Sequence, residues 1–129
     1  MKTILILDDE QIVRDSLSDY FEDRLWRSVQ AQSAEEALEL LENESPDAVV
    51  VDVRLGGMDG DVFIRTARVK YPKLAFVICT GSPAYAVPDD LQGLTQVSTN
   101  LFKKPVVVMA DLEADILQVI ERVKERGER

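Results

Sequence analysis

Short hydrophobic runs alternate along the chain with stretches whose hydrophobic positions repeat at helical spacing. The runs predict five strands, at residues 3–7, 28–31, 48–51, 74–79 and about 99–103. The first run is continuous rather than alternating, which is typical of a strand covered by helices on both faces. The stretches between the runs predict helices over about 10–25, from a capping box at 33–36 to Ser45-Pro46, over about 61–70 and over about 110–126.

The stretch between the fourth and fifth predicted strands does not favour a regular helix. Pro83, Pro88 and Gly93 interrupt it, because proline removes a backbone donor and glycine weakens a helix. Pro88 and the two acids after it suit a first helical turn, so we expect a short helix from Pro88 to near Gly93. Residues 82–87 are expected to form an irregular loop.

The alternation of strands and helices predicts a single α/β domain over residues 1–129. No linker, repeat or low-complexity segment divides the chain, and 46% of its residues are hydrophobic, which is enough for a core. Crossovers between parallel strands are right-handed. This restricts the topology to a doubly wound parallel sheet with helices on both faces.

The charge of the chain excludes several classes of function. With 15 basic and 24 acidic residues, the net charge is −9, which argues against binding to nucleic acid or to anionic membranes.

The chain has no histidine, and Cys79 lies within an apolar run, where a small buried side chain is the simplest interpretation. No signal peptide or membrane span is evident. We therefore expect a soluble, cytoplasmic protein.

Polar residues follow four of the predicted strands, at the edge of the sheet where ligands bind in this fold class. They are Asp8 and Asp9, Asp52, Thr80, and Lys104. Grouped carboxylates require a cation, and hard oxygen ligands suit Mg²⁺. A divalent metal, a lysine and a hydroxyl around one further carboxylate suit the transfer of a phosphoryl group, with that carboxylate as nucleophile.

Each of these residues also has a simpler interpretation. Asp8 or Asp9 can cap the first helix, and Asp52 can form a turn at a strand end. Thr80 can be an ordinary polar strand terminus, and Lys104 a solvated surface charge. These alternatives are less convincing when the residues are taken together, because unrelated polar residues would have to lie at four strand ends by chance.

The ordered set of motifs resembles the receiver domains of bacterial two-component response regulators, over essentially the whole chain. The motifs are Asp8-Asp9, the segment from Asp52 to Gly60, Thr80-Gly81 and Lys104-Pro105. The resemblance implies a flavodoxin-like sheet with strand order 2-1-3-4-5.

The resemblance also implies a role for each site residue. Asp52 is the phosphoacceptor, Asp9 binds Mg²⁺ (or Mn²⁺) directly, and Asp8 binds it directly or through water. Arg54 offers its backbone carbonyl to the metal, whereas Lys104 binds a phosphoryl oxygen. Thr80 swings inward to bind another phosphoryl oxygen, with the backbone N–H of Gly81 close by.

The chain departs from the family pattern at the position three residues before Lys104. Family members often have an aromatic residue there, but this chain has Leu101, with Phe102 next to it. Strand alternation favours Phe102 as a packing residue in the core. The side chain of Arg54 is either a solvated cation or a group that affects how water reaches the phosphorylated site.

These features predict a phosphorylation-controlled switch rather than an enzyme with a separate substrate. A histidine kinase or a histidine phosphotransfer protein would supply the phosphoryl group. A downstream effector protein would then read the changed surface, with a homodimer on activation as a further possibility. Two alternatives stay open, namely a receiver-like scaffold that works without phosphorylation and a phosphohydrolase with an aspartyl nucleophile. Arg54 argues against the phosphohydrolase, since such enzymes typically place a second acid at that position.

Overall fold

The computed structural model describes residues 1–106 and 108–127. The strands are β1 (Thr3–Leu7), β2 (Arg27–Ala31), β3 (Ala48–Val51), β4 (Ala75–Thr80) and β5 (Val97–Lys103). The helices are α1 (Gln11–Asp23), α2 (Ala34–Glu44), α3 (Gly60–Lys70) and α4 (Met109–Gly127). All nine elements lie within about two residues of their predicted positions. No helix among these residues is both long and apolar enough to cross a membrane.

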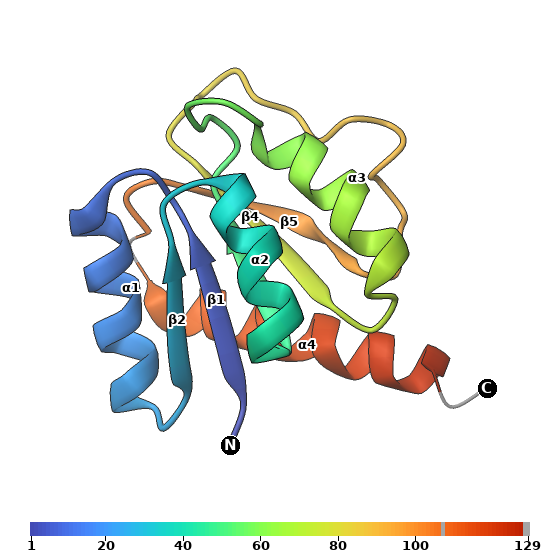
Figure 1. Ribbon diagram of the computed structural model, residues 1–129, viewed down its shortest axis with the longest axis horizontal. Coiled ribbons are helices and arrows are strands. Elements are labelled where there is room, and N and C mark those ends of the chain that lie inside the picture. The colour runs from blue at the N-terminus through green and yellow to red at the C-terminus, as the bar shows by residue number, and fades with distance from the viewer. Residues whose placement is uncertain (107, 128–129) are drawn as a thin grey trace.

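The strands form one parallel sheet in the order β2-β1-β3-β4-β5, as expected (Figure 1). Helices α2 and α3 cover one face of this sheet, and α1 and α4 cover the other. The chain passes from the face of α1 to the face of α2 through β2, and returns to the first face through β5. The doubly wound architecture predicted from the sequence is therefore confirmed.

The central strands are hydrophobic along their whole length because both of their faces are covered. Ile4 and Ile6 of β1 pack towards α1 and α4, whereas Leu5 and Leu7 pack towards α2 and α3. All four side chains are fully buried. Burial of each such side chain contributes roughly 1.5–3 kcal/mol, so these strands hold the two cores together.

The ends of α2 follow the local signals in the sequence. The Ser33 hydroxyl accepts a hydrogen bond from the backbone N–H of Glu36, at 3.1 Å. The Glu36 carboxylate in turn accepts one from the N–H of Gln32, at 3.0 Å. At the other end Ser45 adopts a left-handed conformation, which stops the helix before Pro46.

The segment between β4 and β5 contains no α-helix, so the short helix expected from Pro88 is absent. A single turn forms instead, in which the backbone N–H groups of Leu91 and Gln92 both donate to the Pro88 carbonyl. Gly93 then takes a positive φ of 78°, which turns the chain out of the helical path before another turn can form. The irregular loop expected over 82–87 is observed.

Leu101 and Phe102 point to opposite faces of the sheet. Phe102 packs against the core under α1 and α4, as the strand alternation predicts. Leu101, at the position that is often aromatic in the family, packs on the α2 and α3 side.

Candidate functional site

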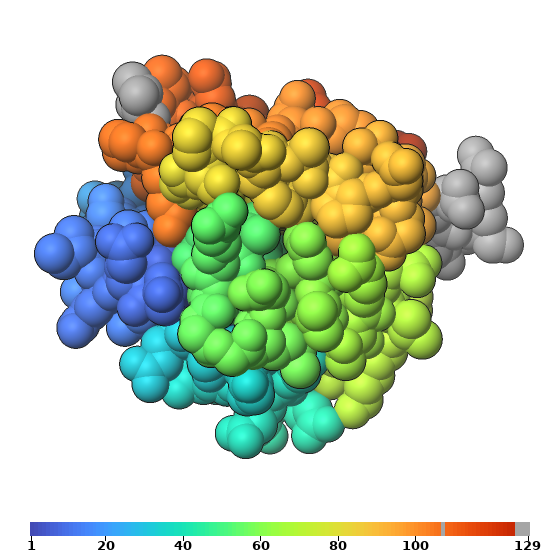
Figure 2. Space-filling view, turned by 90° about the horizontal axis from the view of Figure 1, so that it is seen from above, coloured from blue at the N-terminus to red at the C-terminus, as the bar shows by residue number. Residues whose placement is uncertain are grey.

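The carboxyl ends of four adjacent strands bring the predicted site residues together. Asp8 follows β1, Asp52 follows β3, Thr80 ends β4 and Lys104 follows β5. The register of the sheet aligns these ends, with Leu7 beside Val51 and Thr80 beside Lys103. Figure 2 looks onto this face, where the loops that follow β1, β3, β4 and β5 meet.

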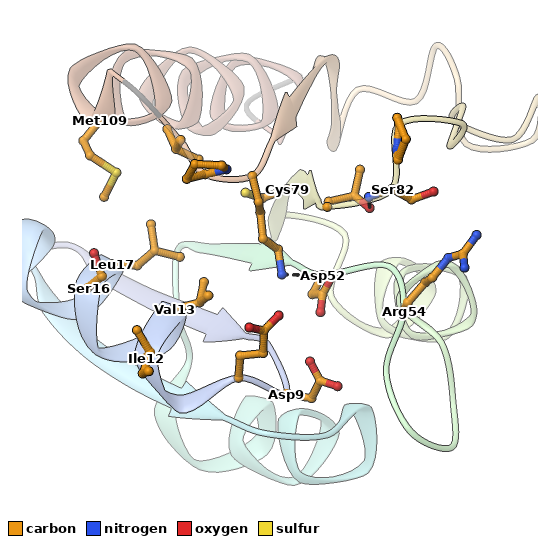
Figure 3. A pocket seen from close by; sticks show the side chains of 17 residues that line it. Asp9, Ile12, Val13, Ser16, Leu17, Asp52, Arg54, Cys79, Ser82 and Met109 are labelled. Atoms are coloured by element: carbon orange, nitrogen blue, oxygen red, sulfur yellow. Dashed lines mark hydrogen bonds and ion pairs between the residues drawn. The ribbon is translucent and has the colours of Figure 1, made fainter.

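A hollow of about 770 Å³ lies at this meeting point. Six of the seven predicted site residues line it, namely Asp9, Asp52, Arg54, Thr80, Gly81 and Lys104. In Figure 3, the Asp9 side chain lies just below that of Asp52, and Arg54 and Ser82 lie on the side away from α1. The seventh residue, Asp8, is buried beside the hollow and contacts Lys104.

Lys104 is the central cation of the site. Its Nζ lies 2.6 Å from Asp8 Oδ2 and 3.4 Å from Asp52 Oδ1. Only 14% of the Lys104 side chain is exposed, so this ammonium is not the solvated surface charge of the simpler interpretation. Burial opposes the charge, but the hydrogen bond to Asp8 and the charge of Asp52 outweigh it and raise the pKa of Lys104.

The surroundings of Asp52 destabilise the charged form of its carboxylate. Burial is the largest cause and the negative charge of Asp8 the second, and together they raise the pKa of Asp52 to about 6 although Lys104 opposes them. A carboxylate in this position is stabilised by additional positive charge. With an edge open to the hollow, its oxygen can attack an electrophile.

Thr80 completes the inner wall of the site from β4. It is 1% exposed, and its Oγ1 accepts a hydrogen bond from the backbone N–H of Ser82, at 3.1 Å. The Thr80 carbonyl accepts another from the N–H of Lys104, at 2.9 Å, which ties the ends of β4 and β5 together. Beside Thr80, burial raises the pKa of the Cys79 thiol to about 11, which agrees with its interpretation as a buried apolar residue.

Carboxylate oxygens of Asp8, Asp9 and Glu10 lie within 4.8 Å of one another. The sequence analysis did not single out Glu10, although its place directly after the two aspartates was a signal. Asp8 Oδ1 accepts a hydrogen bond from the N–H of Glu10, at 2.9 Å, so Asp8 also shapes the turn before α1. Glu10 itself precedes α1 without capping it through its side chain.

The sequence analysis also missed the contact that Gly60 makes with the Asp52 backbone. A Cβ added at Gly60 would lie 2.3 Å from the Asp52 carbonyl oxygen and 2.9 Å from Val51 Cγ1. The Gly60 N–H donates to the Val53 carbonyl, at 2.8 Å, which holds the start of α3 against the end of β3. No local pattern identifies this long-range contact.

Asp59 stands at the N-cap position of α3, but its side chain does not cap the helix. Its Oδ1 accepts a hydrogen bond from the backbone N–H of Leu55, at 3.3 Å, and closes the loop between β3 and α3. The side chain is used by the loop because Gly60 brings the chain back close to β3.

A family model for the response regulator receiver domain matches residues 4–114. The chain belongs to this family. Among its relatives, the sporulation initiation phosphotransferase F of Bacillus subtilis is 32% identical over 89 residues, which cover 69% of each chain. The response regulator protein FleR of Pseudomonas aeruginosa is 32% identical over 85% of this chain, but the matched part is 23% of FleR.

Solved structures of receiver domains share the fold. The CheY-like receiver of Methanospirillum hungatei is 26% identical, with a TM-score of 0.81 over 97% of this chain and 98% of the other. The response regulator TrrA of Thermotoga maritima, solved with Mg²⁺ and BeF, is 21% identical, with a TM-score of 0.79. It covers 92% of this chain and 99% of its own, and at this identity it supports the fold alone.

Proposed function

We propose that this receiver domain is a phosphorylation-controlled switch and that Asp52 is its phosphoacceptor. The observation that carries the proposal is the position of Lys104, whose Nζ lies 2.6 Å from Asp8 and 3.4 Å from Asp52. Strands β1, β3 and β5, which lie far apart in the chain, supply these groups, and a helix cap or a surface charge does not require this convergence.

The donor set fits a divalent cation of the Mg²⁺ type. Asp8 and Asp9 offer carboxylate oxygens close together, and the Asp52 side chain lies near that of Asp9. The raised pKa of Asp52 reflects burial and unbalanced negative charge, which a cation would relieve. We infer that Asp8, Asp9, Asp52 and the backbone carbonyl of Arg54 would hold Mg²⁺ or Mn²⁺. When bound, the ion would neutralise charge on the transferring phosphoryl group.

The chain's own residues have distinct roles in the proposed reaction. An Asp52 oxygen forms a bond to phosphorus while the bond from phosphorus to the donor group breaks, and the donor keeps that electron pair. Lys104 binds a phosphoryl oxygen on the β5 side of the hollow. Thr80 and the backbone N–H of Gly81 bind the group from the β4 side.

The phosphoryl group would alter the surface by drawing Thr80 towards it, since the hydroxyl can donate to a phosphoryl oxygen. In the structure its hydroxyl oxygen accepts from the Ser82 N–H, at the start of the segment between β4 and β5. Rotation of Thr80 towards a phosphoryl group would release Ser82, and a partner protein would bind one of the two surfaces better than the other.

We infer a histidine kinase or histidine phosphotransfer protein as the phosphodonor and a protein as the target. The family membership and the relative named as a phosphotransferase support this inference. A cytoplasmic location follows from these proposed partners. Dimerisation on activation would be one way to present the changed surface.

Intact mass spectrometry after incubation with acetyl phosphate tests the proposal. We expect one phosphoryl adduct on the wild type with Mg²⁺, and none with EDTA or on Asp52→Asn. Asp61→Asn, which also removes a carboxylate close to this end of the sheet, serves as the matched control and should still be phosphorylated. An adduct that persists in Asp52→Asn would contradict the assignment of the nucleophile.

Beryllofluoride binding then separates a switch from a phosphorylation-independent scaffold. We expect Mg²⁺ and beryllofluoride to shift the NMR signals of Thr80, Gly81 and Ser82. If acetyl phosphate and beryllofluoride both leave the wild type unchanged, the scaffold becomes the better description.

A further inference from the structure

A second hollow lies at the opposite end of the sheet, where the chain enters β4 and β5. Its volume is about 470 Å³. The end of α3, the two loops that lead into β4 and β5, and α4 all contribute to its walls. The lining residues are Arg68, Pro72, Lys73, Gly93, Leu94, Thr95, Gln96 and Val123.

The second hollow is basic in a protein that is strongly acidic. Two cationic side chains, Arg68 and Lys73, line it, and none of its lining residues is acidic. The chain as a whole has a net charge of −9. Within the described residues, neither Arg68 nor Lys73 lies within 4.0 Å of a carboxylate oxygen, whereas the neighbouring Arg65 and Lys70 are both paired.

The guanidinium of Arg68 gives a further indication that the second hollow binds an acceptor group. Its Nε is buried and has no hydrogen-bond partner among the described residues. Leaving a buried charged donor unpaired costs on the order of 1–3 kcal/mol, so such a group normally has an acceptor. The nearby Asp90 does not supply one, and its two oxygens accept from Arg65 instead, at 2.7 and 2.9 Å.

The walls of the second hollow are held in place without a ligand. The Gln96 side-chain amide donates to the carbonyls of Tyr71 and Leu74, at 2.8 and 2.9 Å. The Arg122 guanidinium donates to the carbonyls of Thr95 and Val97, both at 3.0 Å. A rigid site loses little conformational entropy on binding, which favours affinity for a small ligand.

We propose that this second hollow binds a phosphate monoester with a small apolar or ring-shaped body. A planar guanidinium and an ammonium match the double negative charge and the paired acceptor oxygens of a phosphate. Pro72, Leu94 and Val123 provide apolar wall for the body of the ligand. The site is separate from Asp52 and would give the protein a small-molecule input besides phosphorylation.

An NMR titration with phenyl phosphate in EDTA tests the proposal, with benzyl alcohol as the uncharged comparison. We expect phenyl phosphate to shift the amide signals of Gly93, Leu94, Thr95 and Gln96 and the Nε–H signal of Arg68 in a saturable way. Benzyl alcohol should produce no saturable shift. Shifts that centre on Lys104, or equal shifts with both probes, would overturn the proposal.

Two variants and a control locate the binding groups. Arg68→Gln and Lys73→Gln should each weaken the affinity for phenyl phosphate by about tenfold or more, the value of one charge-assisted hydrogen bond. Lys124→Gln, an exposed cation on α4 outside the second hollow, should leave it unchanged. Unchanged affinity in both Arg68→Gln and Lys73→Gln would rule out the site, and the exposed Lys73 keeps the test valid if Arg68→Gln does not fold.

Discussion

The strand-end site and the segment between β4 and β5 meet at the same edge of the sheet but are built differently. Asp8, Asp52 and Thr80 are each at most 5% exposed and are placed by strands that pack on both faces. The segment over 82–96 has no helix or strand of its own and buries one large apolar side chain almost fully, Leu91.

Polar contacts to α3 replace the missing packing of this segment. The Tyr85 hydroxyl donates to Asp61 Oδ1, at 2.6 Å, and Arg65 binds Asp90 through two hydrogen bonds. Each of these contacts can break by itself, whereas the strands pack together as one cooperative unit. The difference implies that the surface of this segment can change while the strand-end site stays intact.

The two regions are connected through the first turn of α3. Gly60 packs against the backbone of Asp52, and the next residue, Asp61, holds Tyr85. The segment is also connected to the site through Ser82, which donates to Thr80. A change at Asp52 can therefore reach the segment by two routes, one through Gly60 and Asp61 and one through Thr80 and Ser82.

The largest expected effect is a gain in folding stability when the charge of Asp52 is removed. A carboxyl group whose pKa is raised by folding stabilises the folded state when protonated, so its contribution is lost as the pH rises. The pKa of Asp52 rises from 3.8 to about 6, so the loss falls in this window. Without metal at neutral pH, Asp52→Asn should be more stable than the wild type by up to about 3 kcal/mol.

Urea unfolding in EDTA, at several pH values between about 4 and 7.5, measures this difference. The advantage of Asp52→Asn should shrink as the pH falls through the window. Asp19→Asn, which removes an exposed carboxylate on α1, should show no such trend. A pH-independent advantage would mean that the Asp52 charge is not the cause.

The next largest effect is expected at the junction of the two regions. Gly60→Ala should lower the free energy of unfolding by about 2 kcal/mol, because the new Cβ collides with the Asp52 carbonyl. The better helix propensity of alanine offsets at most about 1 kcal/mol. Gly56→Ala, where an added Cβ meets nothing within 4 Å, is the matched control and should not be destabilised. Equal stabilities of the two variants would show that the backbone contact is not tight.

A smaller effect is expected for the main polar contact of the segment. Burial and the hydrogen bond to Asp61 raise the pKa of Tyr85, which places its hydroxyl as a donor at all ordinary pH values. Tyr85→Phe should cost about 1 kcal/mol and speed hydrogen exchange over 82–92, while phosphorylation of Asp52 stays intact. Tyr71→Phe leaves this contact in place and should not change exchange there. Loss of phosphorylation in Tyr85→Phe would show that the two regions are not separable.

The smallest effect is expected for the exposed pair between Arg65 and Asp90. Exposed ion pairs contribute little because water and salt screen them. A double-mutant cycle with Arg65→Gln and Asp90→Asn, followed by urea unfolding, should give a small coupling that disappears at high salt. A large, salt-insensitive coupling would mean that this pair anchors the segment as firmly as packing does.

Most of the fold was predictable because its signals are local. The continuous apolar strands, the capping box at Ser33 and the break at Ser45-Pro46 each specify an element from a few adjacent residues. The strand-end residues were predictable as a set because parallel strands share one carboxyl edge. The single turn after Pro88 was overestimated as a helix, since no apolar stripe supports it and Gly93 ends it.

The sequence by itself determined the order of strands and helices, the net negative charge and the lack of histidine. It also determined which polar residues stand at the carboxyl ends of the strands. Only the tertiary structure decided that Lys104 lies between Asp8 and Asp52, that Gly60 touches Asp52, and that Arg68 Nε is buried without an acceptor among the described residues. These facts depend on contacts between residues far apart in the chain. Such contacts follow from the packing of whole elements against one another, which no short stretch of sequence encodes.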